Sequence, residues 1–205
     1  MSRACTRVVA VLATLVAFLS AGCVTTAPRP RNPGAGAVVA DGVPVLDYGI
    51  DRCAAGALAS VLGYWGRTVD IEELAAELPV VGKGVLSVDL LIEARERGFD
   101  ARIVEGSADY LEEAILRGEP LILMLRVLDA PGATRDVYHY VVVDGVDSAN
   151  GLIRVHFGKG APRWGKLAKV RRAWEATDKF VLHLRPAADL EGVEHASPDG
   201  STGLS

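Results

Sequence analysis

The chain has 205 residues, of which 50% are hydrophobic and 23% are charged, and its formal net charge at pH 7 is −4. This length and composition fit one globular domain with enough interior to fold alone. The mildly acidic balance, without a basic cluster along any stretch, gives no indication of a nucleic-acid partner.

The first 22 residues have the layout of a secretory signal rather than of a folded segment. Arg3 and Arg7 precede an apolar run over residues 8–19, which is too short for a comfortable membrane span. Small residues then lead to Cys23, as in the bacterial lipoprotein signal, where such a cysteine becomes the acylated N-terminus. The alternative is an ordinary signal peptide with a cysteine nearby. We therefore expect lipid anchoring in a bacterial cell envelope, and Val24 would suit the outer membrane of a two-membrane bacterium.

The remaining chain divides by composition into three parts. Residues 23–38 are rich in proline, glycine and alanine without periodicity, which predicts a flexible tether. Residues 39–186 carry the patterned segments and form the predicted domain. Residues 187–205 are polar and unpatterned, which predicts a disordered tail.

Within the domain, helical patterns come first and strand patterns later. The first helix is expected from Cys53 to about residue 64, before Gly66, and the next two are expected to be capped by Asp70 and Ser87. An α+β fold with helices packed on an antiparallel sheet is the expected class. The later elements are strands at 99–104, 120–127, 138–144, 152–157 and 179–184 and helices at 108–117, capped by Ser107, and 167–176, with the strands at 138–144 and 152–157 forming a hairpin.

Cysteine usage singles out Cys53 as a candidate nucleophile. Cys5 is removed with the signal and Cys23 carries the lipid, so Cys53 has no disulfide partner in a compartment where pairing is usual. At a helix start, the dipole and the unpaired N–H groups favour the thiolate. The alternative is a buried cysteine that serves as a small apolar core residue.

A cysteine nucleophile needs a base, usually a histidine that is close in space. His195 lies in the tail, and His183 lies inside the last strand among apolar neighbours. His139 stands at the entrance of an apolar strand after a turn-rich loop, and it is the preferred candidate, although a structural role is the alternative. Because no histidine or cysteine cluster has metal-ligand spacing, we expect neither a metal nor another cofactor.

Several segments, taken together, share their order and spacing with a known family. They are Val43–Pro44, Cys53 with residues 57–62, residues 63–66, residues 71–74, and His139 with residues 140–143 and Gly145. Together they resemble the papain-like bacteriocin-processing peptidases, the double-glycine leader peptidases, and particularly their exported stand-alone relatives. The resemblance implies a papain-like fold, Cys53 as nucleophile, His139 as base, and a peptide or protein substrate.

Two departures from that family lie around the cysteine. The Gly-Pro pair that usually follows the nucleophile is Ala54–Ala55 here, and the glutamine that supplies an oxyanion donor is replaced by Asp47 or Tyr48. An aspartate would repel the oxyanion, whereas a tyrosine hydroxyl can donate to it, so Tyr48 is the candidate. Loss of one donor typically costs about 10²–10³ in rate.

The third departure concerns the aspartate that orients the histidine in the family. Alignment of the hairpin places that aspartate near His156 on the returning strand, a Cys-His-His arrangement; the alternative is that His156 simply ends a strand. Asp144 is excluded as the partner of His139: an odd offset of five residues on one strand points it to the opposite face, about 16 Å away at roughly 3.3 Å per residue.

These residues lead to the hypothesis of a membrane-anchored, papain-like cysteine peptidase that uses a Cys53–His139 pair. A degenerate, non-catalytic domain that binds peptides or envelope components is one alternative, and a thiol acyltransferase is another. Because the chain has no room for membrane spans or an ATP-binding domain, any coupling to export machinery is expected in trans.

Overall fold

The computed structural model describes residues 32–81, 84–128 and 136–187, and the fold is given for these ranges. The predicted signal, Cys23, most of the tether and nearly all of the tail lie outside the described residues. In the part of the chain that is described, no helix combines the length and the apolar character needed to cross a membrane.

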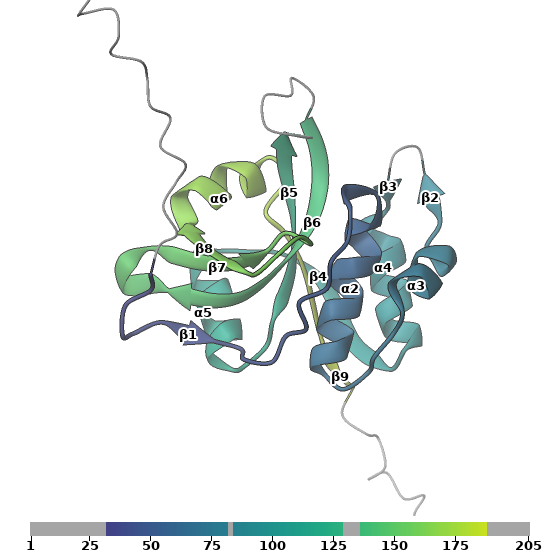
Figure 1. Cartoon of the computed structure of the whole chain (residues 1–205), viewed down its shortest axis with the longest axis horizontal. Helices are drawn as coiled ribbons and strands as arrows, with labels where there is room; N and C mark the ends of the chain where they lie inside the picture. Colours follow the sequence, from purple (N-terminus) through teal and green to yellow (C-terminus); the bar gives the residue numbers. More distant parts are fainter. Residues whose placement is uncertain (1–31, 82–83, 129–135, 188–205) are drawn as a thin grey trace, which may run out of the picture. The chain divides into compact units, whose positions relative to one another are not determined.

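An antiparallel sheet of seven strands is the centre of the fold (Figure 1). Its strand order is β4-β9-β5-β6-β7-β8, with β1 paired to β6, and a separate two-stranded sheet joins β2 and β3. The bounds are β1 Val38–Val39, β2 Val80–Val81, β3 Gly84–Val85, β4 Phe99–Glu105, β5 Leu121–Leu128, β6 Asp136–Asp147, β7 Leu152–His156, β8 Arg163–Lys166 and β9 Phe180–Pro186. The β6–β7 hairpin confirms the sequence prediction, whereas β1, β2, β3 and β8 were not predicted.

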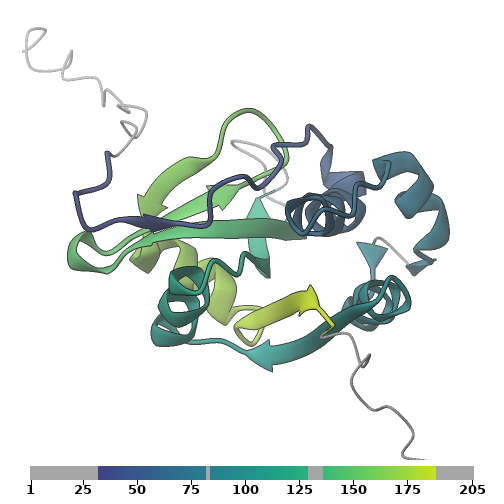
Figure 2. The same ribbon diagram turned by 90° about the horizontal axis from the view of Figure 1, so that it is seen from below.

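Five α-helices cover this sheet from two sides, which confirms the predicted α+β class (Figures 1 and 2). The first three share one core cluster with strands β4, β5, β6 and β9, and the last two share a second cluster with β5, β6, β7 and β9. The helices are α2 Cys53–Tyr64, α3 Ile71–Glu77, α4 Ser87–Glu96, α5 Ala108–Leu116 and α6 Leu167–Glu175, with short 3-10 turns η1 Ile50–Arg52 and η2 Ser148–Asn150.

Two of the three predicted helix caps form as expected. The side chain of Asp70 accepts N–H groups of the first turn of α3, and Ser107 accepts one from α5. The N-cap of α4 is Leu86 without a side-chain cap, so the Ser87 prediction is wrong. Its hydroxyl lies 2.8 Å from that of Tyr140 on β6 instead, so a partner from across the fold prevails over the local cap.

Helix α2 is the element that carries Cys53, and it is buried on all sides. Ten consecutive residues, Cys53 to Leu62, are buried, as expected of a helix that is apolar around its whole circumference. α2 contacts β6, and residues of both belong to the first core cluster. Two of its residues, Gly56 and Gly63, allow Tyr48 and Pro44 to approach closely. Burial of this helix therefore fixes the direction in which its first residue points.

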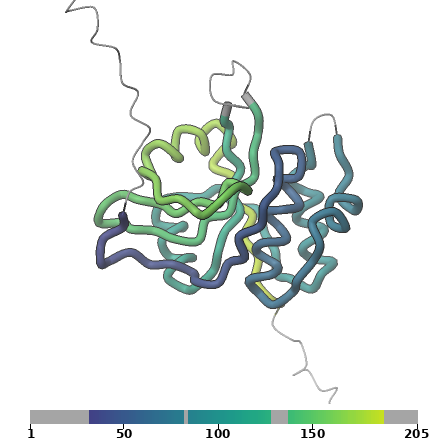
Figure 3. The backbone as a smooth tube through the Cα atoms, viewed as in Figure 1, coloured from purple at the N-terminus to yellow at the C-terminus, as the bar shows by residue number. Residues whose placement is uncertain are grey.

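Residues 40–49, here called the strap, connect β1 to the start of α2 (Figure 3). The amide of Ala40 donates to the Asp144 carbonyl at 2.8 Å, and the amide of Tyr48 donates to the Gly158 carbonyl at 2.6 Å. Before the strap, Val38 pairs with Val146 on β6, at the junction between the predicted tether and the predicted domain. The strap thus holds Tyr48 between the sheet and α2.

Candidate active site

Cys53 is the first residue of α2 and is 7% exposed. No side chain caps this helix start, and the backbone N–H groups of Cys53, Ala54 and Tyr140 act on the sulfur and lower the thiol pKa. Burial acts in the opposite direction and is the larger effect, so the pKa of Cys53 is raised from its ordinary value. The helix start therefore acts in the predicted direction, and burial outweighs it.

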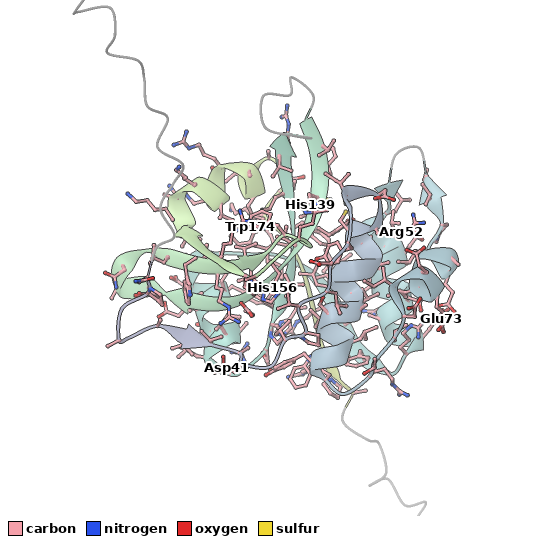
Figure 4. The ribbon with its side chains drawn as sticks, in the orientation of Figure 1. Asp41, Arg52, Glu73, His139, His156 and Trp174 are labelled. Carbon is pink, nitrogen blue, oxygen red and sulfur yellow. The ribbon has the colours of Figure 1, made fainter. Side chains whose placement is uncertain are left out.

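His139 lies on β6, immediately before the residue whose amide acts on the sulfur. Figure 4 shows His139 between the sheet and the end of α2 that follows Arg52. The two predicted residues, Cys53 and His139, are therefore linked through Tyr140, the residue that follows His139 on β6. The ring is 6% exposed, and its burial lowers the pKa of His139 from the ordinary value, partly opposed by a hydrogen bond to the backbone of Phe157.

That hydrogen bond determines which ring nitrogen of His139 is free to act as a base. Nε2 lies 3.1 Å from the carbonyl oxygen of Phe157. Because a carbonyl oxygen only accepts, Nε2 carries the proton in the neutral ring. The other nitrogen, Nδ1, is buried and has no hydrogen-bond partner among the described residues. Nδ1 therefore holds the lone pair.

Phe157 also contacts His139 through its side chain. The two rings are stacked, with centroids 6.4 Å apart and planes 11° apart. Phe157 follows the last residue of β7 and is 39% exposed, so its ring lies partly at the surface and partly over the imidazole. The residue that meets His139 from the returning strand is thus Phe157. Sequence reasoning missed it because a carbonyl acceptor leaves no signal in the residue type.

His156, the predicted third residue, is engaged elsewhere. Its Nε2 lies 2.6 Å from Oδ2 of Asp144, which also pairs with Nη2 of Arg154 at 3.0 Å. The pairing of β6 with β7 shifts register between Val143 and Gly145, and this bulge turns the fully buried Asp144 toward the returning strand. The exclusion of Asp144 as a partner of His139 agrees with this geometry, whereas the structure does not bring His156 to His139.

Tyr48, the predicted oxyanion donor, lies near Cys53. A Cβ added to Gly56 on α2 or to Gly158 after β7 would overlap the Tyr48 ring, so both glycines are required for the ring to fit between them. The hydroxyl is buried and has no partner among the described residues. Burial, together with the nearby Cys53, raises the pKa of Tyr48, so its hydroxyl stays protonated and can donate a hydrogen bond.

The other candidate at this position, Asp47, has a different role. Its Oδ1 accepts the amide of Gly160 at 3.1 Å, which ties the strap to the loop after β7. A hollow of about 320 Å³ opens beside Tyr48 and is lined also by Asp47, Gly49, Lys159 and Gly160. A larger hollow of about 540 Å³ between β5 and α6 contains none of the predicted site residues. Of these two hollows, only the smaller one therefore lies against Tyr48.

Comparison with known proteins gives one family and several similar folds. The sequence profile described as the Peptidase C39 family matches residues 49–184, which is more than half of the chain. Among curated proteins, none is similar enough in sequence to count as a match.

Solved structures of C39-type peptidases have a similar fold at 19% sequence identity. A C39-like peptidase from Bacillus anthracis has a TM-score of 0.60 and covers 74% of this chain and 98% of its own. The peptidase domain of Streptococcus ComA, a bifunctional ABC transporter, has a TM-score of 0.57 and covers 70% and 97%. A double-glycine-motif protease from an AMS/PCAT transporter, solved with its leader peptide, has a TM-score of 0.55 and covers 76% and 98%.

Proposed function

The chain belongs to the peptidase C39 family of papain-like cysteine peptidases, and we propose that it hydrolyses peptide bonds with Cys53 as nucleophile and His139 as base. The observation that carries this proposal is the placement of the Cys53 sulfur beside the amide of Tyr140, the residue that follows His139. The His139 ring, protonated on Nε2, has its basic nitrogen unengaged.

In the first step, Nδ1 of His139 takes the proton of the Cys53 thiol while the sulfur attacks the peptide carbonyl carbon. Because burial raises the pKa of Cys53 and lowers that of His139, the resting pair is neutral, and proton transfer accompanies the attack. The carbonyl oxygen becomes an oxyanion, which the Tyr48 hydroxyl and an N–H group at the start of α2 stabilise.

In the remaining steps His139 returns the proton that it took, and the acyl group is then released from Cys53. The oxyanion intermediate collapses, the C–N bond breaks, and His139 returns its proton to the leaving amine, which leaves an acyl group on the Cys53 sulfur. A water molecule, deprotonated by His139, then attacks this thioester. The C–S bond breaks, the carboxylic acid product leaves, and the thiol is restored by the proton on His139.

The test is hydrolysis of a mixture of synthetic peptides, followed by mass spectrometry of the products. The parent protein is expected to release carboxylic acid fragments, and Cys53→Ala is expected to release none. His139→Ala is expected to lose about 10²–10⁴ in rate, the usual contribution of a general base. His183→Gln changes another buried histidine, on β9, and is expected to keep the parent rate.

The outcomes also separate the two alternatives. Binding of peptides without any Cys53-dependent product would identify a non-catalytic peptide-binding domain. Transfer of the acyl group from Cys53 to an added amine, without hydrolysis, would identify an acyltransferase. Either result would overturn the proposed peptidase activity.

The proposed substrate class is a peptide or protein, which is supported by the family and by the leader peptide bound to the transporter protease described above. We also propose that the protein is exported and anchored to a membrane of a bacterial envelope through lipidated Cys23, in the outer membrane where two are present. Any export machinery would then act in trans. This proposal rests on residues 1–23 of the sequence. Cys23→Ser is expected to move the protein from the membrane fraction to the soluble fraction; retention in membranes would refute the lipid anchor.

A further inference from the structure

We propose that Phe157 is the positioning residue of this site. Its backbone carbonyl orients His139, and its ring excludes water from the imidazole. The proposal rests on the proposed function, because it assigns the group that prepares His139 as a base. In the resembled family an aspartate orients the histidine, and alignment of the hairpin places that aspartate near His156. Here the same task is divided between a main-chain acceptor and an aromatic side chain of one residue.

The carbonyl supplies orientation. The contact of 3.1 Å from Nε2 to the Phe157 oxygen fixes both the tautomer and the rotation of the His139 ring. The oxygen belongs to the residue directly after β7, and the next carbonyl, that of Gly158, accepts the amide of Tyr48. Consecutive carbonyls of one segment therefore hold the base and the proposed oxyanion donor.

The ring supplies the environment. It stacks on the imidazole at 6.4 Å and 11°, and burial is the first cause of the lowered pKa of His139. A carboxylate at this place would act in the opposite direction, because a negative charge stabilises the imidazolium. With a carbonyl and a phenyl ring instead, His139 stays neutral to a lower pH. His139 can therefore accept a proton at a lower pH than it could beside a carboxylate.

The first measurement is ¹⁵N NMR of the histidine side chains in the whole protein, which reports tautomer and pKa without requiring activity. In the parent, His139 is expected to be protonated on Nε2 and to titrate below an ordinary histidine. In Phe157→Ala the imidazole is hydrated, and its pKa is expected to rise. In Phe157→Asp it is expected to rise further, whereas Phe157→Tyr keeps the ring and is expected to restore the parent value.

The second measurement is the pH profile of peptide hydrolysis. Its acidic limb follows protonation of His139, so it is expected to move to higher pH in Phe157→Ala and to return in Phe157→Tyr. Each unit of this shift lowers the rate about tenfold at a pH below both pKa values. Ile103→Ala on β4 is the matched control: Ile103 is 40% exposed, against 39% for Phe157, and it is expected to leave the profile unchanged.

Thermal unfolding of each variant separates a local effect from a failure to fold. An unchanged pKa of His139 in folded Phe157→Ala, or a parent ring protonated on Nδ1, would overturn the proposal while leaving the peptidase activity intact. Conversely, the expected NMR titrations in a protein that hydrolyses no peptide would support the role of Phe157 in setting the state of His139 and overturn only the proposed function.

Discussion

Substitution of Tyr48 by phenylalanine separates catalysis from stability, because the two properties are expected to change in opposite directions. The Tyr48 ring is held between Gly56 and Gly158, so the phenylalanine ring occupies the same space. The change therefore removes a single group, the hydroxyl. In the resting protein that hydroxyl is buried and has no partner among the described residues.

The size of each effect follows from this environment. A buried polar group without a hydrogen bond costs about 1–3 kcal/mol, so its removal is expected to raise the free energy of unfolding by about 1 kcal/mol. In a domain of this size, that corresponds to a rise in Tm of about 2–4 °C. Loss of one oxyanion donor is expected to lower kcat by about 10²–10³. Burial and Cys53 raise the pKa of Tyr48, so the donor is present in the parent throughout the neutral range.

The assay pairs peptide hydrolysis with thermal unfolding and uses Tyr64→Phe as the matched control. The Tyr64 hydroxyl donates to the Gly118 carbonyl at 2.6 Å at the far end of α2. Its loss is expected to cost about 0.5–1.5 kcal/mol of stability without changing kcat. If Tyr48→Phe keeps the parent kcat, the assignment of Tyr48 to the oxyanion is refuted. If it destabilises the protein as Tyr64→Phe does, the hydroxyl has a resting partner and the reasoning fails.

Three further perturbations test the surrounding structure. Gly56→Ala gains about 1 kcal/mol of helix propensity, but its Cβ overlaps the Tyr48 ring, so a net loss of about 1–2 kcal/mol and a lower kcat are expected by thermal unfolding and peptide hydrolysis. Asp144→Ala leaves His156 without its buried partner and is expected to cost about 3–5 kcal/mol by denaturant unfolding; a cost below that of Tyr64→Phe would contradict the importance of this cluster. Iodoacetamide alkylates the thiolate, and the pKa of Cys53 is raised, so the alkylation rate of Cys53, followed by mass spectrometry, is expected to keep increasing at pH values where that of a small free thiol is already constant. A rate that is already constant above about pH 6 would instead indicate that Cys53 is a thiolate at rest.

The architecture follows from local patterns wherever a segment carries its own signal. Helix α2 combines a largely apolar run with Gly66 just beyond its end, and the β6–β7 hairpin has two apolar strands around a turn. Strands β1 and β8 have two and four residues, too few for a local pattern. β1 forms by pairing with the distant β6, and β8 by pairing with the preceding β7. The Ser87 cap was predicted wrongly for the same reason, since Tyr140 reaches it from another part of the chain.

The site divides in a similar way between side-chain and backbone chemistry. Cys53 and His139 could be proposed from the sequence because a cysteine without an expected disulfide partner and a histidine at a strand entrance are visible in the residue types. His156 was assigned by alignment of a hairpin, but Phe157, one residue further, meets His139. The register of β7 and the bulge beside Asp144 depend on the pairing of the whole sheet. The sequence pattern of one hairpin therefore could not distinguish His156 from Phe157 as the neighbour of His139.

The departures from the resembled family all concern side chains, whereas the groups that hold this site together are largely in the main chain. The Phe157 carbonyl holds His139, the Gly158 carbonyl holds the Tyr48 amide, and the Tyr140 amide acts on the sulfur of Cys53. Main-chain groups are placed by the packing of α2 and the pairing of β6 with β7, and they persist when a side chain is exchanged. The absence of the expected glutamine and aspartate therefore does not remove the means of positioning the proposed nucleophile and the proposed base. Because main-chain groups do this positioning, substitutions that disturb the packing of α2, such as Gly56→Ala, are expected to lower activity as directly as substitutions of polar residues do.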